Sequence, residues 1–347
     1  MKTYKRWTII TLLIFLGLMV LLVLTDLGLT VSLPLDEAVF NKEFEEKVRT
    51  FLLSEDGKAV DVILCGDSRA ERQLIPDVVK DRTGLNAVNI ATKGLDLVTL
   101  ANGFKKYSIL QNTDAFIVIS TSIFQINDGA VGDGYTTPAC IFNLKWTSQI
   151  KLFKKYLPYL IDKKMEYYWD YFKSHAESAK SRKKEFLEKG YLAITETIEL
   201  SDGQLKGDIN KITHPWYKDF TFPGRKWEIF QRALRDIASS GNPIIIFNPP
   251  GCPAWLELTQ NTFMDAAERQ FSAFLKQEAQ KYDNVFFLDF YSENRKSFTN
   301  GMFYNLQHLN RKGADVFSRM ISQDISELLK TRKNDVKAQE VFSAPRN

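Results

Sequence analysis

A chain of 347 residues with 44% hydrophobic and 25% charged residues has an ordinary globular composition, long enough for one large α/β domain or two small ones. Its formal net charge of +4 is too small to indicate nucleic-acid binding, and no arginine-rich or aromatic-interleaved motif accompanies it, so nucleic acid is not an expected partner. The three cysteines, Cys65, Cys140 and Cys252, are not spaced as metal ligands; we predict no metal and expect no other cofactor.

The N-terminus has the pattern of a membrane anchor. Residues 1–6 carry Lys2, Lys5 and Arg6, and residues 7–25 contain no charge. About 19 residues at ~1.5 Å each span ~28 Å, close to the hydrocarbon thickness of a bilayer. A cleaved signal peptide is the alternative, but no small-x-small site follows. We predict a single-pass anchor in the cell membrane, with residues 1–6 in the cytoplasm and the main domain outside it.

Residues 26–57 are predicted to connect the anchor to this domain, with a helical pattern over 37–53. In an oxidising compartment, a disulfide between Cys140 and Cys252 is an open alternative. Cys65 is expected to be a small buried hydrophobe.

Apolar runs separated by helical patterns predict an α/β domain over residues 58–330. The predicted strands are 62–65, 87–91, 115–120, 243–248 and 284–290, and the predicted helices are 76–83, 227–238, 265–282 and 312–329. Right-handed crossovers between such elements give a doubly wound parallel sheet of about five strands, of the flavodoxin-like kind. Residues 331–347 are charged and poor in apolar residues, and we predict a flexible tail there.

A helical insertion interrupts this pattern at about 141–226. Residues 145–189 hold twelve Lys or Arg against six Asp or Glu, with aromatic residues interleaved. Such a segment either lies against anionic headgroups, an anionic glycan or a membrane partner, or is a solvated helical lid. His175 and His214 lie in it or in its trailing loop, and we expect surface or structural roles for both.

The strongest chemical signal joins two distant stretches. Gly66-Asp67-Ser68 ends the first strand, which places a serine at the carboxyl end of the sheet. A serine hydroxyl needs a base to become a nucleophile, and His308 lies in the loop before the last helix. A serine activated by a histidine performs acyl transfer on esters.

These two stretches resemble the blocks of the SGNH (GDSL-type) hydrolase superfamily. Gly66-Asp67-Ser68 is similar to its first block, and His308-Leu309-Asn310 with Gly313-Ala314 is similar to its last. The resemblance covers residues 58–330 and implies that Ser68 is the nucleophile and His308 the general base. It also implies an oxyanion hole formed by the Ser68 and Gly94 backbones and an asparagine after the third strand. Here Ser120-Thr121-Ser122 replaces that block, leaving Ser122 or Asn127 as candidates.

The usual acid position, three residues before the histidine, holds Asn305. An amide positions the imidazole but cannot offset its positive charge. Three accounts are open: a Ser68/His308 dyad that uses a carbonyl, recruitment of Asp289 or Glu293 as the acid, or a catalytically weak site.

The anchored layout resembles the DltD and alginate-acetylation type of SGNH-like protein, which works beside a multi-span membrane O-acyltransferase. The resemblance implies a membrane-anchored acyl esterase or O-acyltransferase acting on a cell-envelope polysaccharide or glycolipid. The alternative is a non-catalytic accessory subunit of such an acyltransferase.

Overall fold

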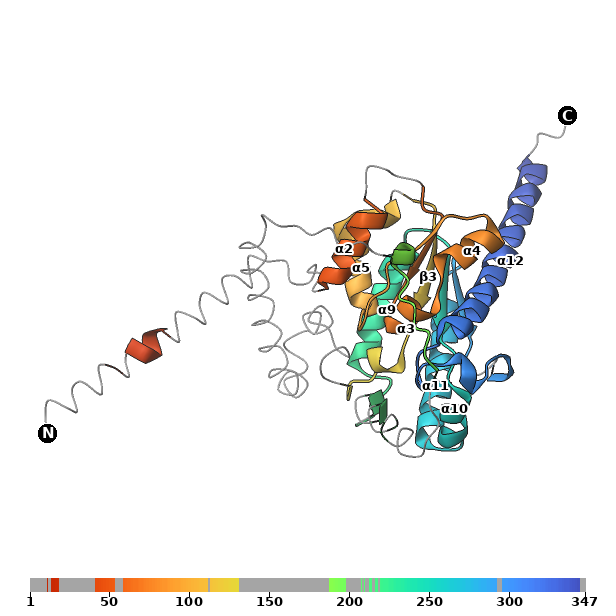
Figure 1. Cartoon of the computed structure of the whole chain (residues 1–347). Helices are drawn as coiled ribbons and strands as arrows, with labels where there is room; N and C mark the ends of the chain where they lie inside the picture. The colour runs from red at the N-terminus through yellow and green to blue at the C-terminus, as the bar shows by residue number, and fades with distance from the viewer. Residues whose placement is uncertain are drawn as a thin grey trace, which may run out of the picture.

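The computed structural model describes an α/β domain and parts of the chain around it (Figure 1). The described residues are 11, 14–18, 41–53, 59–111, 113–130, 187–197, 219–291 and 295–343, with single positions between 207 and 217. Within these residues no helix is both long and apolar enough to cross a bilayer. Most of the predicted anchor (7–25) and most of the predicted insertion (141–226) lie outside the described residues.

Five parallel strands form one sheet, which confirms the predicted α/β class with a parallel sheet of about five strands. Their order is β2-β1-β3-β4-β5, with β1 at Val62–Cys65, β2 at Ala87–Asn89, β3 at Phe116–Ser120, β4 at Ile244–Asn248 and β5 at Val285–Asp289. All residues of the first four strands are buried, as expected for apolar runs covered on both faces. The direction of winding reverses between β1 and β3, so the loops after these two strands diverge around the position where α/β proteins bind ligands.

Helices cover both faces of the sheet (Figure 1). On one side α4 packs against α12, and on the other α5 packs against α9, which is hydrogen-bonded to α11 through Gln231 and Glu278. The helices are α3 (Ser68–Gln73), α4 (Pro76–Thr83), α5 (Leu97–Lys106), α9 (Arg225–Ala238), α10 (Pro253–Thr259), α11 (Phe263–Ala279) and α12 (Arg311–Ser343). Short 3-10 turns are η1 (Ile109–Gln111), η2 (Ile123–Gln125), η4 (Leu187–Gly190), η5 (Arg295–Ser297) and η6 (Asn300–Met302).

The helix within the predicted connector belongs to the domain. This helix, α2 (Lys42–Phe51), buries Phe44 and Val48 completely. Its Lys47, only 1% exposed, donates to Glu71 Oε1 at 2.9 Å and to the carbonyls of Ala91 at 2.6 Å and Gly190 at 3.2 Å. The folded unit therefore includes residues from within 26–57, because a buried charge of this kind needs partners that only the domain supplies.

The last helix is longer than the sequence pattern predicts. Whereas a flexible tail is predicted from residue 331, α12 continues to Ser343 and projects beyond the sheet. Residues 331–343 include good helix formers such as Lys, Arg, Ala, Gln and Glu, which do not need an apolar face to continue a helix that is already nucleated.

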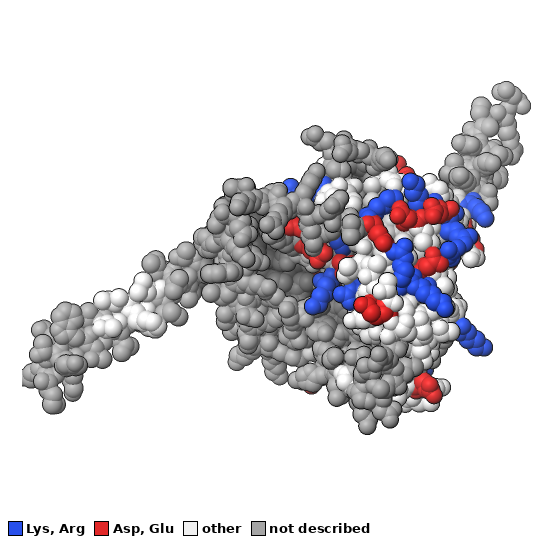
Figure 2. Space-filling view, in the orientation of Figure 1, with Lys and Arg blue, Asp and Glu red and all other residues white. Residues whose placement is uncertain are grey.

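Charges of both signs are mixed on the face that Figure 2 shows, over the region of α4 and the start of α12. Ion pairs there join Lys189 to Asp77 at 2.9 Å and Arg319 to Asp315 at 2.8 Å. Each of these two cations is therefore paired with an acidic neighbour. Most of the basic stretch noted in the sequence, residues 145–189, lies outside the described residues.

Candidate active site

A tight turn after β1 delivers Ser68 to the carboxyl end of the sheet. Gly66 has φ +120°, and a Cβ there would lie 2.7 Å from the Ser120 carbonyl oxygen of the neighbouring strand. A side chain therefore fits neither the backbone conformation nor the space. Asp67 is the N-cap of α3, accepting from the Arg69 backbone N–H at 2.9 Å, so Ser68 is the first helical residue and is partly exposed.

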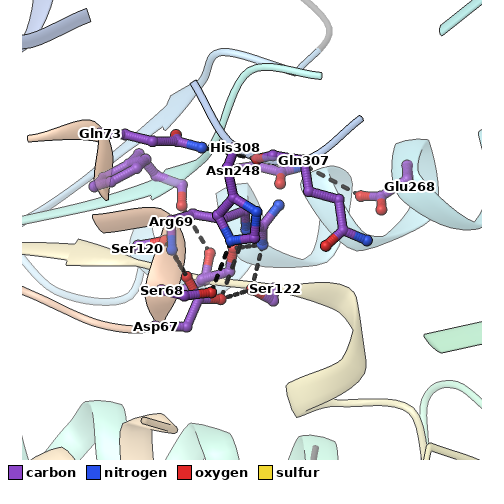
Figure 3. A network of polar contacts seen from close by, with 12 residues as sticks. Asp67, Ser68, Arg69, Gln73, Ser120, Ser122, Asn248, Glu268, Gln307 and His308 are labelled. Atoms are coloured by element: carbon purple, nitrogen blue, oxygen red, sulfur yellow. Dashed lines mark hydrogen bonds and ion pairs between the residues drawn. The ribbon is translucent and has the colours of Figure 1, made fainter. Parts of the chain in front are cut away.

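The three residues expected to carry the chemistry lie in one hydrogen-bonded chain. Ser68 Oγ is 2.9 Å from His308 Nε2, and His308 Nδ1 is 3.0 Å from Asn305 Oδ1. The serine and the histidine are 240 positions apart in the sequence and meet at the switch between β1 and β3 (Figure 3). This is the arrangement in which an imidazole can remove the serine proton while its other nitrogen is held.

Asn305 fixes the histidine tautomer although it carries no charge. Its Oδ1 also accepts from the backbone N–H groups of Gln307 at 3.0 Å and His308 at 2.9 Å. Because these two donors require an oxygen at that position, the ring Nδ1 must donate the third hydrogen bond. Nε2 is then unprotonated and faces the Ser68 hydroxyl as an acceptor.

The His308 loop is held by the residues that follow it. Asn310 donates from Nδ2 to the Gly301 carbonyl at 3.0 Å and accepts from the Gly313 N–H at 3.2 Å. A Cβ at Gly313 would collide with the Met302 carbonyl oxygen, so the motif Asn310-x-x-Gly313 serves close packing of this loop on α12. From α3, Gln73 donates to the Gln307 carbonyl at 2.8 Å, which ties the serine helix to the histidine loop.

The surroundings disfavour a protonated imidazole. Although His308 keeps partial solvent access, the protein around the ring removes most of its hydration, and this lowers its pKa to about 3. The positive charges of Arg72 and, to a smaller extent, Arg69 act in the same direction. His308 is therefore neutral at physiological pH, but the imidazolium formed during general-base catalysis lacks the usual anionic neighbour.

A second polar cluster lies on the β3 side of Ser68 (Figure 3). Asp67 accepts from Ser120 Oγ at 3.2 Å and forms a short hydrogen bond with Ser122 Oγ. Arg69 donates from Nη2 to the Thr121 carbonyl at 2.7 Å and also contacts Ser122 Oγ. Its guanidinium carbon lies 5.3 Å from the centre of the Trp216 ring.

The two candidates for the third oxyanion donor are engaged elsewhere. The Ser122 hydroxyl is completely buried between Asp67 and Arg69. Asn127 is also completely buried: its Nδ2 donates to the Trp216 carbonyl at 2.8 Å, and its Oδ1 accepts from the Thr221 N–H at 2.9 Å. Asn127 therefore holds the last part of the predicted insertion (141–226) against the loop after β3.

Gly94 lies in the turn after β2, with φ +71°. The Thr92 N–H in that loop donates to the Gly66 carbonyl at 3.1 Å. The loop that carries Gly94 is therefore bonded directly to the turn that carries Ser68, as an oxyanion donor would require.

The remaining sequence candidates are distributed as follows. The acceptor for His308 Nδ1 is Asn305 itself; Asp289 ends β5 in register with Asn248, and Glu293 is outside the described residues. His175, His214 and Cys140 are also outside them. Cys252 is a buried free thiol that donates to Asn300 Oδ1 at 3.2 Å, so the possible disulfide with Cys140 is not formed, and Cys65 is buried in β1 as expected.

The sequence did not predict the charged groups Arg69, Arg72 and Glu268 near Ser68. Arg69 and Arg72 are cations of α3, and Glu268 lies behind the site, where Tyr217 donates to it at 2.6 Å and burial raises its pKa. The available signal was an arginine directly after the serine. In the described part of the chain no group of three His, Cys, Asp or Glu side chains could hold a metal ion.

Comparisons with protein-family models and with curated proteins find no match to this chain.

Proposed function

We propose that this protein is a membrane-anchored, extracytoplasmic acyl esterase or O-acyltransferase of the SGNH type. It acts on an acylated cell-envelope polysaccharide or glycolipid through a serine acyl-enzyme. The observation that carries this proposal is the chain from Ser68 Oγ to His308 Nε2 at 2.9 Å and from His308 Nδ1 to Asn305 Oδ1 at 3.0 Å.

The geometry supports a two-step acyl transfer. Ser68 Oγ attacks the ester carbonyl carbon while its proton passes to His308 Nε2, and the carbonyl π electrons move to the oxygen. The tetrahedral intermediate then expels the alcohol, which takes the proton from His308 and leaves an acyl-Ser68. Water or an acceptor hydroxyl then gives its proton to the same nitrogen and attacks the acyl carbon. The second tetrahedral intermediate expels Ser68 Oγ, which takes the proton back from His308.

The membrane part of the proposal is supported by the uncharged stretch 7–25 and its basic flank in the sequence. We expect the full-length chain to fractionate with membranes and a C-terminal tag to be cut by protease in intact spheroplasts. A tag protected in spheroplasts but cut after lysis contradicts the extracytoplasmic location. Partnership with a multi-span membrane O-acyltransferase would appear as co-purification of the two proteins in mild detergent.

A second candidate function is an accessory subunit that uses the same fold without turnover. Two observations favour it: Asn305 stands where an acid is expected, and the charges of Arg72 and Arg69 oppose a protonated His308. A weak general base lowers the rate of serine attack but does not impair a docking surface.

A serine-directed fluorophosphonate probe separates the two candidates. If Ser68 is an activated nucleophile, the full-length protein is labelled, and labelling is lost in Ser68→Ala and His308→Ala. Ser326→Ala, which removes a hydroxyl of α12 that donates to the Ser322 carbonyl, serves as the control and retains labelling of Ser68. Absence of labelling in the folded wild-type protein supports the accessory subunit.

A further inference from the structure

The geometry around Ser68 leaves one question of the proposed reaction open: which group stabilises the negative oxygen of the tetrahedral intermediate on the β3 side. Fixed N–H donors aimed at this oxygen are often the largest contribution to catalysis. Ser122 and Asn127 are buried and already hydrogen-bonded. Neither of these two residues therefore offers a free donor on this side.

Arg69 has N–H groups that the fold does not use. Its Nη2 hydrogens are directed to the Thr121 carbonyl and Ser122 Oγ. Its Nε is buried without a hydrogen-bond acceptor, and among the described residues no acceptor contacts Nη1. Asp67 Oδ2 is 3.6 Å from Nε, which is an ion-pair distance but too long for a hydrogen bond. A buried guanidinium with unused donors is costly unless an acceptor is supplied.

The position of Arg69 suits an acceptor formed on Ser68. The two residues are neighbours at the start of α3, and the hydrogen bond to Thr121 holds the guanidinium at the end of β3, beside the turn after β1. The Trp216 ring covers it at 5.3 Å. Figure 3 shows Arg69 gathered with Ser68, Ser122 and His308. Arg69 is only 7% exposed, so water competes little for its donors.

We infer that the Arg69 guanidinium is a catalytic donor of this site and stabilises the oxyanion of the tetrahedral intermediate on Ser68. This inference rests on the proposed function. It also explains how a site without a carboxylate beside its histidine could react: the positive charge of Arg69 disfavours the imidazolium but favours the oxyanion formed in the same step. The site thus stabilises the negative charge on the substrate oxygen instead of the positive charge on the histidine.

An alkyl or aryl boronic acid tests this inference, because it adds reversibly to a serine oxygen and forms a tetrahedral boronate anion. We expect Arg69→Met to weaken boronate binding and to lower kcat/KM for a small neutral ester, both by about 10²-fold or more, while KM changes little. Arg69→Lys keeps the charge but loses the planar donors, and its loss should be smaller. Added methylguanidinium should restore part of the activity of Arg69→Ala.

Arg319→Met is the control, since it removes a surface cation of α12 that pairs with Asp315. It should keep boronate affinity within about threefold of wild type, because Arg319 has no part in the Ser68 site. Chemical denaturation of each variant distinguishes loss of the donor from loss of the fold.

The outcomes are distinguishable. One outcome overturns only the role of Arg69 and leaves the proposed function standing. In it, the boronate binds wild type but not Ser68→Ala, and it binds the folded Arg69→Met or Arg69→Lys as tightly as wild type. Boronate that binds wild type no better than Ser68→Ala overturns the proposed function and this inference with it. Parallel losses in boronate affinity and kcat/KM, with methylguanidinium rescue, support it.

Discussion

On one side of Ser68 the His308 loop has the geometry that its sequence motif suggests, and on the other side the end of β3 does not. Ser68, His308 and Asn305 form a continuous chain with hydrogen bonds of 2.9 and 3.0 Å. The β3 side instead consists of Asp67, Ser122 and Arg69 bonded to one another. Both sides differ in charge from a serine hydrolase with an acid: the amide of Asn305 stands where a carboxylate is expected beside the histidine, and on the β3 side Arg69, our proposed oxyanion donor, adds a cation that pairs with Asp67. The first difference disfavours the attack of Ser68 on the ester, and the second favours it.

The largest expected effect comes from removing the nucleophile or the base. Ser68→Ala and His308→Ala should each reduce hydrolysis of a small activated ester by about 10³-fold or more, because nucleophile and base act as one unit. Steady-state hydrolysis by the full-length protein in detergent measures this effect. Equal activity in both variants and wild type would mean that hydrolysis does not occur at Ser68.

A smaller effect tests the turn that joins the two sides. Gly66→Ala should lower the free energy of unfolding by about 3 kcal/mol, because φ +120° and the contact with Ser120 both disfavour a Cβ. Gly84→Ala is the matched control: its φ is +75°, but nothing lies within 4 Å of the added carbon, so a loss of ~1 kcal/mol is expected. Denaturant unfolding of both variants makes the comparison, and equal losses would show that the contact with β3 is easily relieved.

Restoring the missing anion sharpens the comparison. Asn305→Asp should raise ester hydrolysis by about tenfold, equivalent to ~1.4 kcal/mol of transition-state stabilisation, because a carboxylate offsets the imidazolium charge. Asn305→Ala is the control, since it removes the acceptor that fixes the tautomer and should lower the rate. No gain in Asn305→Asp, with Ser68→Ala and His308→Ala inactive, would show that another group already compensates for the charge of His308.

The smallest effect concerns pH. Since the pKa of His308 is lowered to about 3, the base form persists, and the activity due to this group should change less than about twofold between pH 8 and pH 5. In Asn305→Asp the carboxylate should raise this pKa, so the acidic loss of activity should begin at a higher pH. A wild-type profile that falls near pH 6.5 would show that His308 titrates normally.

The lowered pKa of His308 also makes the free energy of unfolding depend on pH. In the unfolded chain this histidine binds a proton near pH 6.5, whereas in the folded chain it does so only near pH 3. The unfolded state therefore holds more protons in this range, and the contribution of His308 to stability falls as the pH drops from about 6.5 towards 3. His308→Gln should be less sensitive to pH over the same interval in denaturant unfolding.

The sheet was predictable because its strands are short apolar runs buried on both faces, and such runs end at polar or turn residues. The structure places β1 at Val62–Cys65 and β4 at Ile244–Asn248, within a residue of the predicted bounds. Helix α5 was missed although Asp96 caps it by accepting from the Thr99 N–H at 2.8 Å, because its apolar content resembles that of a strand. Propensity alone also did not indicate where α12 ends.

The pairing of Ser68 with His308 was predictable because both sequence motifs place their residues at the carboxyl edge of the sheet. The proposed role of Arg69 was not predictable from the sequence, since spacing along the chain does not specify which acceptors a long side chain reaches. The same holds for Ser122 and Asn127, whose partners Asp67 and Trp216 come from other segments. The sequence indicates which residues reach the carboxyl edge of the sheet. Tertiary contacts decide which of their polar atoms remain free to bind a substrate.

Burial of Lys47 makes this amine a chemical reporter of α2. All three of its protons are directed to acceptors, in α3, in the loop after β2 and at Gly190, and the residue is 1% exposed. An acylating reagent must reach the amine nitrogen, so the buried Lys47 should resist acetic anhydride or succinimidyl esters while surface lysines react. Its modification, read by mass spectrometry, would therefore measure how often α2 separates from α3 while the sheet stays folded.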